Sequence, residues 1–307
     1  MNDLTPGRLK GTLLERAAAL YDLAPPPLPP GAPEPVRESP IPPRAVAAQL
    51  AKPLARPRLR SGPVVRIDRQ ALLDAGMIVP GAAVSALAEE FRLVKRQLLM
   101  TARAVEATAP ERARAVLICS ANPGDGKTFC ALNLALSLAA EKDLEVLLVD
   151  ADFAKPDVLA RLGLAEESRG LLDALADPTI DVEDCILATD VPQLSILPAG
   201  TKTHFDTELV ASARARTVIE SLVRGSPDRL VIFDSPPALA ASAASVLAGL
   251  VGQVMLIVRA DRTSEGDLRN AVALLDGCDQ LQLVLNSVSL QPGGRRFGQY
   301  YHQEAAQ

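Results

Sequence analysis

Short, uninterrupted apolar runs alternate with helical segments from Ala115 onward. The runs are AVLICS, LEVLLVD, LSILPAG, RLVIFDSPP, QVMLIVRAD and LQLVLNSV. Apolar runs without polar alternation are typical of strands covered on both faces, and strands separated by helices pair in parallel. The sequence therefore predicts an α/β fold, a mostly parallel sheet with helices on both faces.

A helix is predicted before the first of these strands, because apolar residues recur there every three or four positions. Its apolar stripe consists of Val84, Leu87, Phe91, Val94 and Leu98. A shorter amphipathic helix is expected over residues 12–23, where the pattern stops at three consecutive prolines.

Proline content divides the chain. Of its 25 prolines, 13 fall between Pro25 and Pro63, which predicts an extended linker. We expect an N-terminal helix within residues 1–24, a linker over 25–63, a folded nucleotide-binding domain over 64–290 and a flexible tail over 291–307.

Composition excludes several classes of partner. The net charge is −5 and the predicted pI is near 5.3, which disfavours nucleic acid as a partner. The four cysteines lie far apart and neither histidine is near one, so we expect buried thiols and no structural zinc. No run reaches eighteen uncharged apolar residues, so we expect a cytoplasmic protein that neither is secreted nor spans a membrane by itself.

The segment ANPGDGKT, residues 121–128, matches the P-loop pattern between an apolar strand and a helix. Glycines let the backbone turn its amides toward phosphate oxygens at the helix N-terminus. Lys127 is expected to bind the β- and γ-phosphates of ATP, and the Thr128 hydroxyl to bind Mg²⁺. The expected nucleotide contacts are Pro123, Gly124, Asp125, Gly126, Lys127, Thr128 and Phe129. The alternative is an ordinary glycine-rich turn.

Three aspartates follow later strands. Asp150 and Asp152 end LLVDAD, and Asp234 ends LVIFD, at the edge where ligands collect in open parallel sheets. Carboxylates close to a triphosphate require a cation between them, so Mg²⁺ is expected, with Thr128, Asp150 and Asp234 as ligands. Taken singly, each aspartate is equally compatible with a helix cap. Arg259 and Asn286, at the ends of two later strands, are candidates for adenine binding.

These motifs resemble the bacterial tyrosine kinases of polysaccharide export, whose Walker A, A′ and B motifs correspond here to ANPGDGKT, LLVDADFAKP and VIFDSPP. The resemblance runs from EEFRLVKR to VLNSV. TLLERAAAL, ALAEEFRLVKRQLL and the linker are most similar to the exosortase-associated autokinases. The resemblance to these kinases implies a P-loop fold of the deviant-Walker, SIMIBI-like type.

The resemblance also implies residue roles. Lys127, Asp150 and Asp152 would be catalytic, with the two aspartates assisting metal placement and activating the tyrosine hydroxyl. Glu89, Arg92 and Lys95 would fill the ring-forming E-x-x-R-x-x-R pattern of a homo-oligomer, although such a helix is equally compatible with a solvated charged face. Tyr300 and Tyr301 would be phosphoacceptors. The expected partner is the cytoplasmic tail of a membrane polysaccharide chain-length regulator, which places the chain peripherally at the inner membrane.

Two departures from the family keep a second function open. Ala154 stands where the family has arginine, next to Lys155, and the tail has two tyrosines instead of many. The alternative to an autokinase is a nucleotide-dependent switch that docks a membrane partner without tyrosine chemistry. A partition-type ATPase is disfavoured because Asn122 replaces that branch's signature lysine. A dinucleotide enzyme is disfavoured because no G-x-G-x-x-G follows the first strand.

Overall fold

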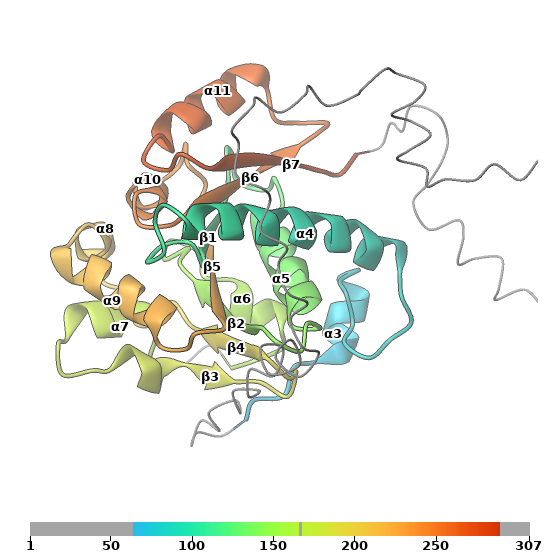
Figure 1. Cartoon of the computed structure of the whole chain (residues 1–307), viewed down its shortest axis with the longest axis horizontal. Helices are drawn as coiled ribbons and strands as arrows, with labels where there is room; N and C mark the ends of the chain where they lie inside the picture. The colour runs from blue at the N-terminus through green and yellow to red at the C-terminus, as the bar shows by residue number, and fades with distance from the viewer. Residues whose placement is uncertain (1–63, 166–167, 289–307) are drawn as a thin grey trace, which may run out of the picture. The chain divides into compact units, whose positions relative to one another are not determined.

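The computed structural model describes residues 64–165 and 168–288. Within these ranges one sheet has the strand order β3-β4-β2-β5-β1-β6-β7 (Figure 1). All neighbouring strands are parallel except β3, which runs antiparallel to β4. The strands are β1 Ala115–Ser120, β2 Glu145–Asp150, β3 Leu187–Ala188, β4 Leu194–Leu197, β5 Arg229–Asp234, β6 Gln253–Arg259 and β7 Leu281–Asn286. The predicted mostly parallel sheet is confirmed, and only the two-residue edge strand β3 was not predicted.

Helices cover both faces of this sheet. One face packs against α3 Arg69–Asp74, α4 Ala86–Glu106, α5 Lys127–Leu138 and α6 Val158–Arg161. The other packs against α7 Leu171–Ala176, the 3-10 helix η1 Val182–Cys185, α8 Asp206–Val210, α9 Ala213–Arg224, α10 Ala243–Ala248 and α11 Glu265–Leu274. The expected helices on both faces are therefore present.

Both faces of the central strands are buried, which explains their uninterrupted apolar runs. All six residues of β1 are buried, and so are all six of β5. Because successive strand residues point to opposite faces, Leu117 packs into one hydrophobic core and Ile118 into the other. A polar residue in the middle of either strand would lie in a core.

The predicted helix before β1 is α4. It begins after Ser85, whose hydroxyl accepts a hydrogen bond from the amide of Ala88, as an N-cap does. Leu98 is fully buried on its inner face. Val84 precedes the cap and is exposed, so it does not belong to the apolar stripe.

The segment before α3 joins the domain at its β3 edge. Val65 forms an isolated parallel bridge with Thr189. The Asp190 carboxylate accepts hydrogen bonds from the amide of Ile67 at 3.0 Å and from the guanidinium of Arg69 at 2.8 Å. These contacts tie the chain to the sheet well before the first strand.

Several expectations lie outside the described residues: the N-terminal helix, the linker, the tail, and Tyr300 and Tyr301. In residues 64–165 and 168–288, no helix combines the length and apolarity that crossing a membrane requires.

Candidate nucleotide site

The loop between β1 and α5 has the backbone that the P-loop pattern predicts. Gly124 and Gly126 have φ values of 85° and 97°, in the left-handed region that glycine adopts without steric cost. Gly126 is the N-cap of α5, and no side chain forms a capping hydrogen bond to the amides of the first turn. Such amides, at the positive end of a twelve-residue helix, can bind phosphate oxygens.

Asn286, at the end of β7, holds this loop from outside. Its Nδ2 donates to the carbonyl oxygen of Asp125 at 2.9 Å, while the Asp125 carboxylate accepts from the amide of Asn122 at 3.0 Å. A Cβ added to Gly126 would lie 2.2 Å from Asn286 Nδ2, so a larger residue there would have to displace the Asn286 side chain from the loop. Asn286 was predicted to contact nucleotide, and its amide supports the phosphate loop.

The sheet brings the predicted lysine and aspartates together. Lys127 Nζ lies 2.6 Å from the Asp152 carboxylate and 3.8 Å from that of Asp234. It also donates to the hydroxyl of Thr128 at 3.2 Å. Asp150 and Asp234 are register partners on the adjacent strands β2 and β5, so their side chains start side by side.

Asp234 is fully buried; the Thr128 hydroxyl lies near its carboxylate, but neither oxygen has a well-aligned hydrogen-bond donor among the described residues. Burial raises its pKa to about 6, against the opposing charge of Lys127. Burial alone would lower the pKa of Lys127, but the charges of Asp234 and Asp152 hold that pKa above its ordinary value. A buried carboxylate without donors is stable only near positive charge, which Mg²⁺ would supply together with Lys127.

Asp150 has a different environment. Its oxygens accept hydrogen bonds from the amides of Asp157 and Val158, both at 3.1 Å, and of Asp152 at 3.3 Å. Burial, and next the charge of Asp234, raise its pKa to about 7. Asp150 therefore shapes the loop after β2, and Asp152 is the aspartate in direct contact with Lys127.

The described residues contain no ready-made cluster of three His, Cys, Asp or Glu side chains for a metal ion. This fits Mg²⁺, which commonly binds one or two protein groups and completes its shell with phosphate oxygens and water. Thr128 and Asp234 are the groups beside Lys127 that would hold it, with Asp150 next to Asp234. The residues present thus fit Mg·ATP.

Two arginines, Arg259 at the end of β6 and Arg262 after it, lie beside the glycine loop. Arg259 Nη1 donates to the carbonyl of Gly124 at 3.2 Å, and Arg262 Nη1 would lie 3.0 Å from a Cβ added to Gly124. Asn122 also reaches this region, because its amide donates to Asp267 at 3.0 Å. Arg259 was predicted to bind adenine, whereas Arg262 was not predicted to lie at the site. The only sequence signal for Arg262 is its position three residues after Arg259.

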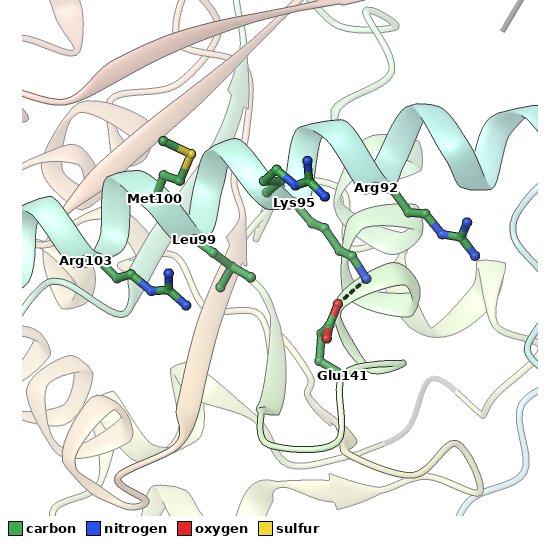
Figure 2. A pocket seen from close by; sticks show the side chains of 7 residues that line it. Arg92, Lys95, Leu99, Met100, Arg103 and Glu141 are labelled. Carbon is green, nitrogen blue, oxygen red and sulfur yellow. Dashed lines mark ion pairs between the residues drawn. The ribbon is translucent and has the colours of Figure 1, made fainter. Parts of the chain in front are cut away.

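Pro123 and Phe129 flank the loop: Pro123 is exposed, and Phe129 packs against the core on the α5 side. Of the predicted oligomerisation residues, Glu89 and Arg92 form an ion pair within α4. Lys95 lies 2.5 Å from the Glu141 carboxylate and donates to the carbonyl of Ser137 at 3.0 Å (Figure 2). All three contacts are internal to one chain, and their role in assembly stays a prediction.

A family model described as an AAA domain matches residues 113–275, more than half of the chain. A Ralstonia solanacearum protein named as a candidate tyrosine-protein kinase, EpsB, is 32% identical over 185 residues, covering 60% of this chain and 24% of EpsB. This chain thus spans about a quarter of that relative's length. The tyrosine-protein kinase YwqD of Bacillus subtilis is 27% identical, covering 74% of this chain and 92% of YwqD.

The solved structures that resemble this chain include kinase domains of the same kind as these relatives. The chimerical protein CapA2B2 is 26% identical with a TM-score of 0.57, covering 74% of this chain and 94% of its own. The VpsO kinase domain is 29% identical with a TM-score of 0.51, and the match covers 64% of this chain and 97% of the VpsO domain. The predicted P-loop fold and the predicted resemblance to bacterial tyrosine kinases are confirmed.

Proposed function

The chain belongs to the AAA-domain family, and from that premise we propose that it is an ATP-dependent protein-tyrosine autokinase regulating bacterial exopolysaccharide biosynthesis or export. The relatives named tyrosine-protein kinases support the reaction. One observation carries the proposal: the ammonium of Lys127 lies between the carboxylates of Asp152 and Asp234 at the mouth of a glycine loop.

This arrangement supplies what phosphoryl transfer needs, which is positioning and neutralisation of charge. Mg·ATP, when bound, supplies the γ-phosphoryl group and a divalent charge. The backbone amides of residues 124–129 and the Lys127 ammonium would bind phosphate oxygens, while Thr128 and Asp234 would hold the metal. Asp152 takes the proton of the tyrosine hydroxyl as the tyrosine oxygen gains the phosphoryl group and ADP leaves. Asp150 holds the loop that positions Asp152.

The test is incubation of the purified chain with Mg·ATP, followed by mass mapping of phosphate. We expect phosphate on Tyr300 or Tyr301 and none in Lys127→Met or Asp152→Asn variants. Lys142→Met, which removes an exposed lysine beyond the C-terminal end of α5, is the matched control and should remain active. Tyr21 is the only other tyrosine, so the assignment is direct.

A nucleotide switch without tyrosine chemistry is the second candidate, and the surroundings of Ala154 favour it. This exposed residue brings no charge to the loop after β2, and a neighbouring cation, Lys202, donates only to its carbonyl oxygen at 3.3 Å. ATP turnover with no phosphate on tyrosine would support the switch. A chain that ignores Mg·ATP altogether would contradict both functions.

The proposal extends to assembly and location. We expect a homo-oligomer that uses the α4 face of Glu89, Arg92 and Lys95. The expected partner is the cytoplasmic tail of a membrane polysaccharide chain-length regulator, which would hold the chain at the inner membrane. Similarity to the chimerical protein CapA2B2 supports a second protein as partner.

A further inference from the structure

A groove of about 430 Å³ runs along α4 beside Glu141, which follows the C-terminal end of α5 (Figure 2). Its lining residues are Arg92, Lys95, Arg96, Leu99, Met100, Arg103 and Glu141. Four cations face a single carboxylate, so the groove carries net positive charge. Its volume suits a side chain or short peptide segment.

Two of these cations have no partner in the part of the chain that the structure describes. Arg92 is paired with Glu89, and Lys95 with Glu141. Among the described residues, Arg96 and Arg103 form neither a hydrogen bond nor an ion pair, and both are exposed. They stand seven positions apart, two helical turns, so they lie on the same side of α4.

The surface between the two arginines is apolar. Leu99 is half-buried and Met100 is 58% exposed, so both offer apolar surface between the two guanidinium groups. Guanidinium groups beside an apolar surface match a phosphate carried on an aromatic ring, because arginine binds phosphate with two parallel hydrogen bonds. The groove therefore has the chemistry to bind phosphotyrosine.

The chain itself carries such a group within reach. β7 lies beside α4, since Gln282 Nε2 donates to the hydroxyl of Thr101. Tyr300 is twelve positions after Val288, and twelve residues span at most about 40 Å. Because a helix of 21 residues is about 30 Å long, the two tyrosines can reach any part of the groove.

Charge makes the contact dependent on phosphate. The segment 289–307 has only three charged side chains, Arg295, Arg296 and Glu304, so without phosphate it offers little attraction to a basic groove. Each phosphate would add about −1.5 to −2 charges. We infer that the α4 groove binds the phosphorylated C-terminal segment of this chain through Arg96 and Arg103. The inference rests on the proposed autokinase function and names the site that its product occupies.

The experiment measures binding of a synthetic peptide of residues 295–307, phosphorylated on both tyrosines, to the full chain carrying Tyr300→Phe and Tyr301→Phe. The affinity of the unphosphorylated peptide should be at least roughly tenfold lower than that of the phosphopeptide. Arg96→Ala with Arg103→Ala should weaken phosphopeptide binding by a similar factor, and Arg96→Lys with Arg103→Lys should fall between, because lysine keeps the charge without the fork. Calorimetry gives the affinities, and circular dichroism verifies folding.

The matched control is Arg216→Ala with Arg224→Ala, which removes two exposed arginines from α9 and should leave binding unchanged. Unaltered phosphopeptide affinity in the Arg96 and Arg103 variant would overturn the inference. So would equal affinity for a peptide with glutamate in place of both tyrosines, or binding only to anionic phospholipid vesicles. Because the peptide is synthetic, its binding does not depend on kinase activity. If the phosphopeptide binds but the chain does not autophosphorylate, the proposed kinase function is contradicted, whereas the assignment of the groove as a phosphotyrosine site is supported.

Discussion

The ammonium of Lys127 lies 2.6 Å from the carboxylate of Asp152. Lys127 opens α5 after β1, whereas Asp152 lies in the loop after β2, and β5 separates the two strands in the sheet. The contact therefore crosses the carboxyl edge of three strands. It means that the charge expected to bind phosphate already neutralises buried carboxylates in the folded chain.

Replacing this lysine should strongly reduce the stabilisation of the chain by nucleotide. We expect Lys127→Met to bind Mg·ATP roughly tenfold to hundredfold more weakly, because charge-assisted bonds to phosphate are lost. The measurement is the rise in melting temperature with added Mg·ATP, which depends on affinity. Lys142→Met, at an exposed position beyond α5, should behave as the unaltered chain, and an equal loss in that variant would contradict the assignment of Lys127.

Gly126→Ala should be far more damaging than Gly81→Ala. Both glycines have positive φ, 97° and 82°, so alanine costs about 1–2 kcal/mol of backbone strain at either position. Only at Gly126 would the new Cβ also collide with Asn286, since nothing lies within 4 Å at Gly81. Chemical denaturation and Mg·ATP titration of both variants measure the difference. Equal stability and affinity would show that Asn286 is free to move away.

Arg229 should be essential for stability. Its side chain is only 4% exposed and forms ion pairs with Glu145 and Glu183. Arg229→Met would remove the buried cation from two half-buried carboxylates, which should cost more than a surface ion pair, about 1–3 kcal/mol. Arg224→Met is the control, because its pair with Glu220 is on the surface of α9 and is worth under about 1 kcal/mol. Urea unfolding of both variants gives the comparison, and similar losses would be inconsistent with the buried pair.

Two buried thiols predict an alkaline loss of stability. Burial raises the pKa of Cys119 from its ordinary value of 9.0 to about 11 and that of Cys130 to about 12. Between pH 9 and these values the unfolded chain releases protons that the folded chain retains, so the free energy of unfolding falls as pH rises, by roughly 1 kcal/mol per pH unit for each thiol. Unfolding curves from pH 8 to 10.5 should show a shallower decline for Cys119→Ala. An identical slope in that variant would exclude Cys119 as a cause.

Removal of residues 1–60 should leave Mg·ATP binding unchanged. The contacts of the candidate site come from residue 122 onward, and Val65 already joins the sheet through Thr189. Fluorescent nucleotide titration of the truncated and full chains checks this expectation. A large loss of affinity in the shorter chain would contradict a modular arrangement.

Local sequence was sufficient for the strands and the phosphate loop. Buried parallel strands require apolar side chains on both faces, so β1 and β5 appear in the sequence as continuous apolar runs. Such runs can be recognised without tertiary information. The glycines at 124 and 126 are equally local, because their backbone angles are accessible to few other residues. The short strand β3 carried no such signal, since two residues establish no period.

Other features depend on residues far apart in the chain. Nothing near Arg229 in the sequence identifies Glu145 and Glu183 as its partners, and nothing near Lys95 identifies Glu141. The division between Asp150, which binds backbone amides, and Asp152, which contacts Lys127, arises only when the loop after β2 folds back.

The sequence alone thus determined the α/β fold class, the P-loop and the aspartates at strand ends, since each follows from local periodicity or local backbone geometry. Tertiary structure decided which aspartate meets the lysine, how Asn286 holds the loop and which cations of α4 remain unpaired. These depend on the packing order of the strands and helices, and contacts across that order are not encoded in any short segment.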